Sequence, residues 1–335
     1  MQTDLLHYAV WAPVAAFALA LVFVWRLTRL GLGQFAIDRP NERSLHNVPT
    51  PRTGGLGLHA AVLLSWPIAG AAIPNVILLL YLGLIVVSAM DDVRGLPVLV
   101  RLAAHLIAGC TVSAYLLLPS AAPATVILGA LCIVWMINLY NFMDGSDGLA
   151  GGMALFGFVF YGIAAHMAGS TAFALLNFSI ASAAAAFLIF NFHPARIFLG
   201  DAGSIPLGFL AGSFGLAGWL QNCWTWWFPL LVFSPFIVDA SVTLLKRACA
   251  RANIWRAHRD HYYQRLVQMG WGHRRTALFE YALMCICGVS ALAGLGCSQS
   301  AQLALLTTVT AAYAMLIIAI EIAWRNFHRA RGHDA

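Results

Sequence analysis

Apolar runs separated by short polar segments extend along the whole chain, and they constrain its fold more than any other feature. About eleven of them are long enough to cross a lipid bilayer, at roughly 17–25 residues each with a few shorter. They cover approximately residues 8–28, 54–73, 75–90, 98–118, 124–141, 149–168, 171–190, 203–221, 226–245, 276–296 and 302–324. Because backbone polar groups must be satisfied within the bilayer, such runs predict helices. The sequence therefore predicts an all-α, polytopic integral membrane protein with about 11 transmembrane helices.

The composition agrees with a membrane protein. Of the 335 residues, 61% are hydrophobic and only 10% are charged, whereas a soluble domain carries about 25% charged residues. The first apolar run lacks a small-residue cleavage site, so we interpret it as a retained helix rather than a signal peptide. The seven cysteines have no spacing typical of a zinc site or a disulfide framework.

Basic residues predict the orientation of the helices. With the N-terminus outside, the inside segments are 29–53, 91–97, 142–148, 191–202, 246–275 and the tail after 324. All 19 Lys and Arg residues lie in these segments or within a helical turn of one, as the positive-inside rule requires. The net charge of +6 then reflects orientation and contact with anionic lipid headgroups. No nucleic-acid-binding motif accompanies it, and we expect no nucleic acid partner.

Acidic residues gather at the same predicted face. Besides Asp38 and Glu42 in the first inside loop, seven of the 13 lie at or near this face: Asp91, Asp92, Asp144, Asp147, Asp201, Asp239 and Asp260. Helix capping or a solvated loop would explain one such residue, but seven at one face indicate function, because ionisable groups near a bilayer are costly. No internal repeat or long linker is visible. We therefore expect one membrane domain, residues 1–335, whose inside loops form the active site.

Two aspartate pairs have spacings that suit an active site. Asp91 and Asp92 end the third apolar run, and either a metal or a proton-accepting role fits adjacent carboxylates. Asp144 and Asp147 lie in N-F-M-D-G-S-D-G, after Asn141. Its glycines allow the backbone to approach a ligand, and the amides at the start of the next helix suit phosphate. An ordinary Asp-Gly turn is the alternative.

Two further segments carry polar groups for a nucleotide. In NFHPARIFLGDAGS, Asp201 lies between glycines, the Phe198 ring could stack on a base, and Arg196 could pair with phosphate. In RAHRDHYYQRL, His258 and His261 are expected to share a helix face and to bind phosphate. An amphipathic helix lying on the membrane surface is the alternative for this second segment.

The resulting residue set is rich in oxygen donors, with basic groups around them. Hard oxygen ligands suit Mg²⁺ or Mn²⁺, and Mg²⁺ is usually held by few carboxylates together with substrate phosphates. The chemistry indicated is phosphoryl transfer at the cytoplasmic face, with a lipid as one substrate.

Five segments, in order from RPNERSLHNVPTPRTGGLG (Arg39 to Gly57) to HRDHYYQRL, resemble the polyprenyl-phosphate N-acetylhexosamine-1-phosphate transferases. That family includes the enzymes that start O-antigen and enterobacterial common antigen, and phospho-N-acetylmuramoyl-pentapeptide transferase. The resemblance implies catalytic roles for Asp91, Asp92, Asp144 and Asp147. It implies Asp201 as a magnesium ligand, helped by Asp144 or Asp147. It implies substrate binding by Asn141, Arg52, Arg196, Phe198, His258 and His261, with Phe198 on uracil and the histidines on the phosphates.

The reaction implied by the resemblance depends on Mg²⁺ (or Mn²⁺). N-acetylhexosamine-1-phosphate passes from a UDP-sugar to undecaprenyl (polyprenyl) phosphate at the cytoplasmic face of the bacterial inner membrane. UMP is released and a lipid-linked glycan such as O-antigen, for lipopolysaccharide or another cell-wall polymer, is initiated. The N-terminus would be periplasmic and the C-terminus cytoplasmic. Direct attack by the lipid phosphate and a covalent aspartyl-phosphate intermediate stay open, as do the sugar and a homodimer.

Three other activities fit the sequence less well. The H-R-D-H loop departs from the consecutive histidines of the muramyl-pentapeptide enzymes, which favours O-antigen initiating enzymes over the peptidoglycan-type activity. A transporter of a lipid-linked sugar would place its acids near the bilayer midplane and commonly shows a repeat. The CDP-alcohol phosphotransferase pattern D-G-x-x-A-R…G-x-x-x-D is missing after Asp147.

Overall fold

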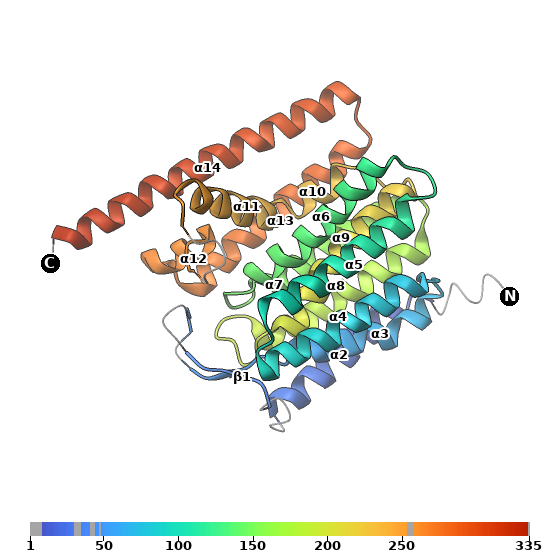
Figure 1. Cartoon of the computed structure of the whole chain (residues 1–335), viewed down its shortest axis with the longest axis horizontal. Coiled ribbons are helices and arrows are strands. Elements are labelled where there is room, and N and C mark those ends of the chain that lie inside the picture. Colours follow the sequence, from blue (N-terminus) through green and yellow to red (C-terminus); the bar gives the residue numbers. More distant parts are fainter. Residues whose placement is uncertain (1–8, 30–34, 41–43, 47, 253–257, 334–335) are drawn as a thin grey trace.

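The computed structural model of this chain describes residues 9–29, 35–40, 44–46, 48–252 and 258–333 (Figure 1). The described part is almost entirely helical, as the sequence predicts. Its elements in chain order are α2 (Ala12–Arg29), β1 (Ile37–Asp38), β2 (Thr50–Pro51), α3 (Gly54–Ser65), η1 (Trp66–Ala69), α4 (Asn75–Arg94), α5 (Val98–Leu117), α6 (Pro123–Phe142), α7 (Leu149–Met167), α8 (Thr171–Asn191), α9 (Asp201–Leu220), α10 (Phe228–Val232), α11 (Ser234–Cys249), α12 (Tyr262–Leu266), η2 (Val267–Trp271), α13 (Gly272–Leu295) and α14 (Gln299–His333).

Nine helical segments in the described residues are long and apolar enough to cross a membrane. The other two expected spans fold as shorter pieces. The run at 54–73 becomes α3 and the 3₁₀ turn η1, and the run at 226–245 becomes α10 and α11. Pro229 and Pro235 lie in the first turns of α10 and α11, where a missing N–H leaves no hydrogen bond unmade. These prolines explain why one apolar run forms two helices.

The centre of the bundle is formed by α7, α8 and α9. More than two thirds of each is buried, whereas α14 is only 11% buried and lies along the outside of the molecule (Figure 1). Small residues allow close helix contacts, as is usual in membrane proteins. A Cβ atom on Gly55 of α3 would lie 2.2 Å from the Cα of Gly203 in α9. The start of α3 is therefore tightly packed on the start of α9.

Three details of the predicted inside loops are wrong. The third span extends to Arg94 and ends at Gly95, whose φ is +67°, so the inside loop is shorter than residues 91–97, while Asp91 and Asp92 end the span as expected, in the last turn of α4. Asp201 begins α9. His258 and His261 do not share a helix face, because both precede α12.

The connecting segments predicted to lie inside meet at one end of the bundle. The antiparallel pair β1–β2, with Asp38 opposite Thr50, lies at the same end as α12 (Figure 1). The backbone of Phe198 donates to the Pro51 carbonyl, and Gly54 donates back to the Phe198 carbonyl. The first loop and the α8–α9 loop are thereby fixed side by side. The orientation of this end in the membrane stays a prediction.

Candidate active site

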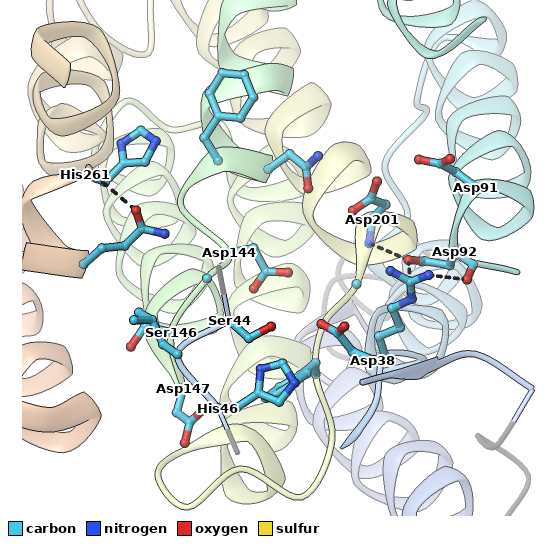
Figure 2. Close-up of a pocket in the computed structure, with 18 of the residues that line it drawn as sticks. Asp38, Ser44, His46, Asp91, Asp92, Asp144, Ser146, Asp147, Asp201 and His261 are labelled. Atoms are coloured by element: carbon cyan, nitrogen blue, oxygen red, sulfur yellow. Dashed lines mark hydrogen bonds and ion pairs between the residues drawn. The ribbon is translucent and has the colours of Figure 1, made fainter. Parts of the chain in front are cut away.

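A cavity of about 810 Å³ opens at this end of the bundle. Its lining comes from the first loop, the α6–α7 and α8–α9 loops, the ends of α4, α6, α8 and α11, the starts of α5, α9 and α13, and the residues in and just before α12 (Figure 2). Ten of the predicted site residues line it: Arg52, Asp91, Asp92, Asn141, Asp144, Asp147, Phe198, Asp201, His258 and His261. Five segments that are far apart in sequence therefore contribute to one cavity.

Asp92 holds the beginning of α9. Its two carboxylate oxygens accept the backbone N–H groups of Asp201, at 3.2 Å, and Ala202, at 2.9 Å. Arg52 donates to the Asp92 carbonyl at 2.6 Å, and its Nε lies 3.4 Å from an Asp92 oxygen. A carboxylate at a helix N-terminus satisfies otherwise unpaired amides and complements the helix dipole. Asp92 is thus engaged in fixing the position of Asp201.

Asp91 faces a different set of partners. Leu96 N–H donates to its Oδ1 at 2.5 Å, and Arg101 Nη1 lies 3.0 Å from its Oδ2. The same Arg101 nitrogen is 3.5 Å from Asp201 Oδ2, so one guanidinium group meets both carboxylates. Arg101 was not predicted as a site residue. Arg101 follows the predicted third span after only a short connection, and this closeness to Asp91 could have indicated a role in the site.

Asp144 lies opposite Asp201 across the cavity (Figure 2). The Gly200 amide donates to its carboxylate. Desolvation, followed by the negative charges of Asp201 and Asp92, raises the pKa of Asp144 well above its usual range. Repulsion of this kind is relieved by a cation between the carboxylates.

The carboxylates of this cluster decide how a metal could be held. Among the residues that the structure describes, no three His, Cys, Asp or Glu side chains are spaced to hold a metal by themselves. Asp144 and Asp201 nevertheless provide hard oxygen donors on facing segments. That donor set fits a divalent cation that takes few protein ligands and completes its shell with substrate phosphates or water.

Asp147 belongs to a separate group of contacts. Its Oδ2 lies 2.7 Å from His193 Nδ1 and accepts the Ala195 N–H at 3.1 Å. Figure 2 shows its carboxylate directed away from Asp144 and Asp201. The ring of His193 stacks on that of His273, with centroids 5.4 Å apart and an interplanar angle of 9°. The structure therefore brings Asp144, but not Asp147, towards Asp201, and the sequence reasoning missed both histidines.

The ring of Phe198 forms part of the cavity wall beside His46, with ring centroids 4.9 Å apart in an edge-on arrangement. The following turn needs Gly200, because its φ is +74° and a Cβ atom there would lie 2.3 Å from the Arg52 carbonyl oxygen. Arg196 does not reach the cavity. Its guanidinium donates to the Ile189 carbonyl and lies over the Phe190 ring. The predicted contact of Arg196 with substrate is therefore not supported by the position of its side chain.

His258 and His261 come together without a helix. Their rings stack with centroids 5.0 Å apart. Asp239 fixes this segment, since Oδ1 lies 3.1 Å from His261 Nδ1 and accepts the Tyr262 N–H, while Oδ2 accepts the Tyr263 N–H. Burial, with smaller effects of His261 and Arg247, lowers the pKa of His258 from 6.5 to about 4. His258 is therefore neutral near pH 7 and offers hydrogen bonds rather than charge.

The segment with the two histidines is also tied to the C-terminal helix. Glu321 of α14 accepts hydrogen bonds from the Tyr262 hydroxyl at 2.9 Å and from Arg265 at 2.8 Å, and it pairs with Lys246 of α11. The buried side chains of Tyr262, Leu266 and Ile320 pack beside these contacts. α14 thereby braces α12 and the residues before it.

Comparison with known proteins agrees with this site. The model of glycosyl transferase family 4 matches residues 75–218. A probable undecaprenyl-phosphate N-acetylglucosaminyl 1-phosphate transferase of Bacillus subtilis is 28% identical, and the match covers 83% of this chain and 84% of that protein. The resemblance expected from the sequence is confirmed by these similarities.

Two more relatives of this family show its breadth. A decaprenyl-phosphate N-acetylglucosaminephosphotransferase of Mycolicibacterium smegmatis is 29% identical, over 73% of this chain and 72% of that protein. A phospho-N-acetylmuramoyl-pentapeptide-transferase of Moorella thermoacetica is 33% identical, over 50% of this chain and 51% of that protein. The family 4 match spans α4 to α9. It therefore includes the Asp91 to Asp201 cluster but neither the first loop nor the histidine segment.

Proposed function

We propose that this chain transfers N-acetylhexosamine-1-phosphate from a UDP-sugar to undecaprenyl (polyprenyl) phosphate at the cytoplasmic face of the bacterial inner membrane. The products are UMP and a polyprenyl-diphosphate-linked sugar, the start of a lipid-linked glycan such as O-antigen. The polyprenyl-phosphate sugar-phosphate transferases among its relatives support this reaction.

The observation that carries the proposal is the composition of the cavity. Carboxylates, two guanidinium groups and an aromatic ring converge on it at the end of an apolar helix bundle. Four apolar side chains also line the cavity: Leu96, Val98, Phe142 and Leu244. A cavity that combines these groups suits a diphosphate, a base and an isoprenoid tail together.

Asp144 and Asp201 would hold a divalent cation, with Mg²⁺ preferred for its hard oxygen ligands. When bound, the cation would neutralise charge on the diphosphate and on the departing UMP. Asp91 would accept a proton from the lipid phosphate, because its Oδ2 meets the Arg101 side chain, whereas both Asp92 oxygens accept backbone N–H groups that fix α9. Arg101, between Asp91 and Asp201, provides the positive charge that a phosphate requires.

The bond changes follow from these positions. An oxygen of the lipid phosphate forms a bond to the β-phosphorus of the UDP-sugar, and the bond from that phosphorus to the bridging oxygen breaks. The electron pair stays on the α-phosphate, which leaves as UMP. Phe198 would hold the uracil, and His258 and His261 would donate hydrogen bonds to the sugar-bearing phosphate.

The test uses the purified chain with undecaprenyl phosphate, Mg²⁺ and a panel of UDP-sugars, and it measures UMP. We expect UMP release with a UDP-N-acetylhexosamine and only when the lipid is present. If UDP-N-acetylmuramoyl-pentapeptide were the only UDP-sugar that released UMP, the activity would instead be the peptidoglycan-type one. Counterflow of a lipid-linked sugar in proteoliposomes without UMP would identify a transporter.

A further inference from the structure

His273, in the first turn of α13, contacts two segments that are distant in sequence. Its Nε2 lies 3.1 Å from the Leu45 carbonyl oxygen. A carbonyl only accepts, so Nε2 carries the proton and donates it. Its Nδ1 lies 2.9 Å from Ser146 Oγ and accepts the Asp147 N–H at 3.4 Å. In the neutral ring Nδ1 is an acceptor, so Ser146 donates its hydroxyl proton.

The surroundings hold the His273 ring in this position. Its side chain is only 12% exposed, and it stacks on His193 at an angle of 9°. His193 contacts Asp147 at 2.7 Å. The ring thus joins the first loop, the α6–α7 loop and the α8–α9 loop to the start of α13, and it lines the cavity.

Leu45 lies between Ser44 and His46, and all three line the cavity. The His46 ring meets Phe198, the aromatic residue assigned to the base in the proposed function. If the Leu45 carbonyl loses this hydrogen bond, this part of the wall loses its contact with His273, and with it the link through His273 to Ser146 of the α6–α7 loop. The end of the cavity assigned to the nucleotide would then be less rigid before the UDP-sugar binds. A less preorganised site binds its ligand more weakly.

We propose that His273 is a positioning residue for the nucleotide donor: by donating to Leu45 it holds the wall formed by Ser44, Leu45 and His46 against the Ser146 loop. This inference rests on the proposed function of the same cavity. His273 takes no part in the bond changes, so its loss should weaken donor binding and leave the chemical step nearly unchanged.

Two substitutions distinguish the roles of the two ring nitrogens of His273. His273→Gln places an amide donor near the position of Nε2 and can keep the contact with Leu45. His273→Asn places its amide near the position of Nδ1 and is too short to reach Leu45. The loss of one hydrogen bond predicts a KM for the UDP-sugar, and a Kd for UMP, about fivefold to tenfold higher in His273→Asn. We expect kcat to change by less than about twofold, and His273→Gln to resemble the wild type.

Arg274→Ala is the matched control, because Arg274 is the exposed neighbour of His273 and should bind UMP as the wild type does. Calorimetric titration with UMP measures binding without turnover, and thermal midpoints show whether each variant is folded. A folded His273→Asn protein with wild-type UMP affinity would overturn the inference, as would a loss of kcat at unchanged KM. UMP binding by a wild type that releases no UMP from any UDP-sugar would overturn the proposed reaction alone, and a wild type that does not bind UMP would overturn both.

Discussion

Asp91 and Asp92 are neighbours in the chain with different partners in the structure. Asp92 caps α9, while Asp91 meets Arg101, which also meets Asp201, beside the cavity. The sequence could predict that these acids gather at one face, because they flank apolar runs. It could not assign their separate partners, because that depends on where α4 ends and on which side of it α9 begins. The direction of Arg196 was unpredictable for the same reason.

Asp201 should be indispensable for transfer. Asp201→Asn keeps the size of the side chain but removes the negative charge proposed to hold the cation, so we expect UMP release to fall at least about a hundredfold. Membrane insertion and the thermal midpoint should stay close to those of the wild type. EDTA should abolish activity in the wild type, and added Mg²⁺ should restore it. Wild-type turnover by Asp201→Asn would refute the assignment of this residue as a metal ligand.

His258 predicts a dependence of stability on pH. Its folded-state pKa is about 4, below the ordinary value of 6.5. Between these values the unfolded chain binds more protons, so this contribution to stability is complete above about pH 6.5 and is lost as the pH falls towards 4. On going from pH 7 to pH 4.5, the thermal midpoint of the wild type should decrease more than that of His258→Gln. Equal decreases in the two proteins would exclude this effect.

At the scale of elements, apolar length predicted where the helices lie, but not how they break or approach one another. Both incomplete spans begin as ordinary apolar runs, and their interruption depends on local proline positions and on neighbouring packing. The contact of α3 with α9 depends on Gly55 and Gly203. A glycine in the sequence does not indicate which helix it packs against, and the chain has 29 glycines.

The packing of α3 on α9 can be tested with two glycine substitutions. Gly55→Ala inserts a methyl group 2.2 Å from the Gly203 Cα, so the helices must separate, at a cost of about 1–3 kcal/mol. Because α9 carries Asp201, activity should fall together with the thermal midpoint. Gly83→Ala in α4 is the matched control, because nothing lies within 4 Å of its added Cβ atom. Equal midpoints for the two variants would contradict the close contact.

At the scale of the whole molecule, charge and hydropathy predicted that distant loops would converge at one end, and the cavity confirms their convergence. The loops after α4, α6 and α8 are short, so their positions follow from the helices that they join. The first loop and the connection from α11 to α12 are longer. Asp239 and Glu321 hold Tyr262 at the end of the second of these, two contacts that no local pattern indicates.

The predicted orientation can be tested by labelling single cysteines in intact cells whose outer membrane has been removed. The native cysteines, five of them exposed, are first replaced. An impermeant maleimide should label Ser120→Cys and Gln221→Cys, in turns at the predicted outer face. It should label Arg94→Cys and Arg259→Cys only after permeabilisation. Labelling of Arg94→Cys and Arg259→Cys from opposite sides would rule out a shared cytoplasmic face and with it the proposed site.

The bracing of α12 by α14 has a practical consequence for anyone who produces this protein. A fluorescent fusion partner or a purification handle attached after Ala335 is joined to the helix that carries Glu321. A bulky appendage there would disturb the contacts of Glu321 with Tyr262 and Arg265 and so distort kinetic measurements, whereas truncation before Glu321 would leave Asp239 to hold the histidine segment without these contacts. Handles on this protein should therefore be cleavable, and rates should be compared before and after they are removed.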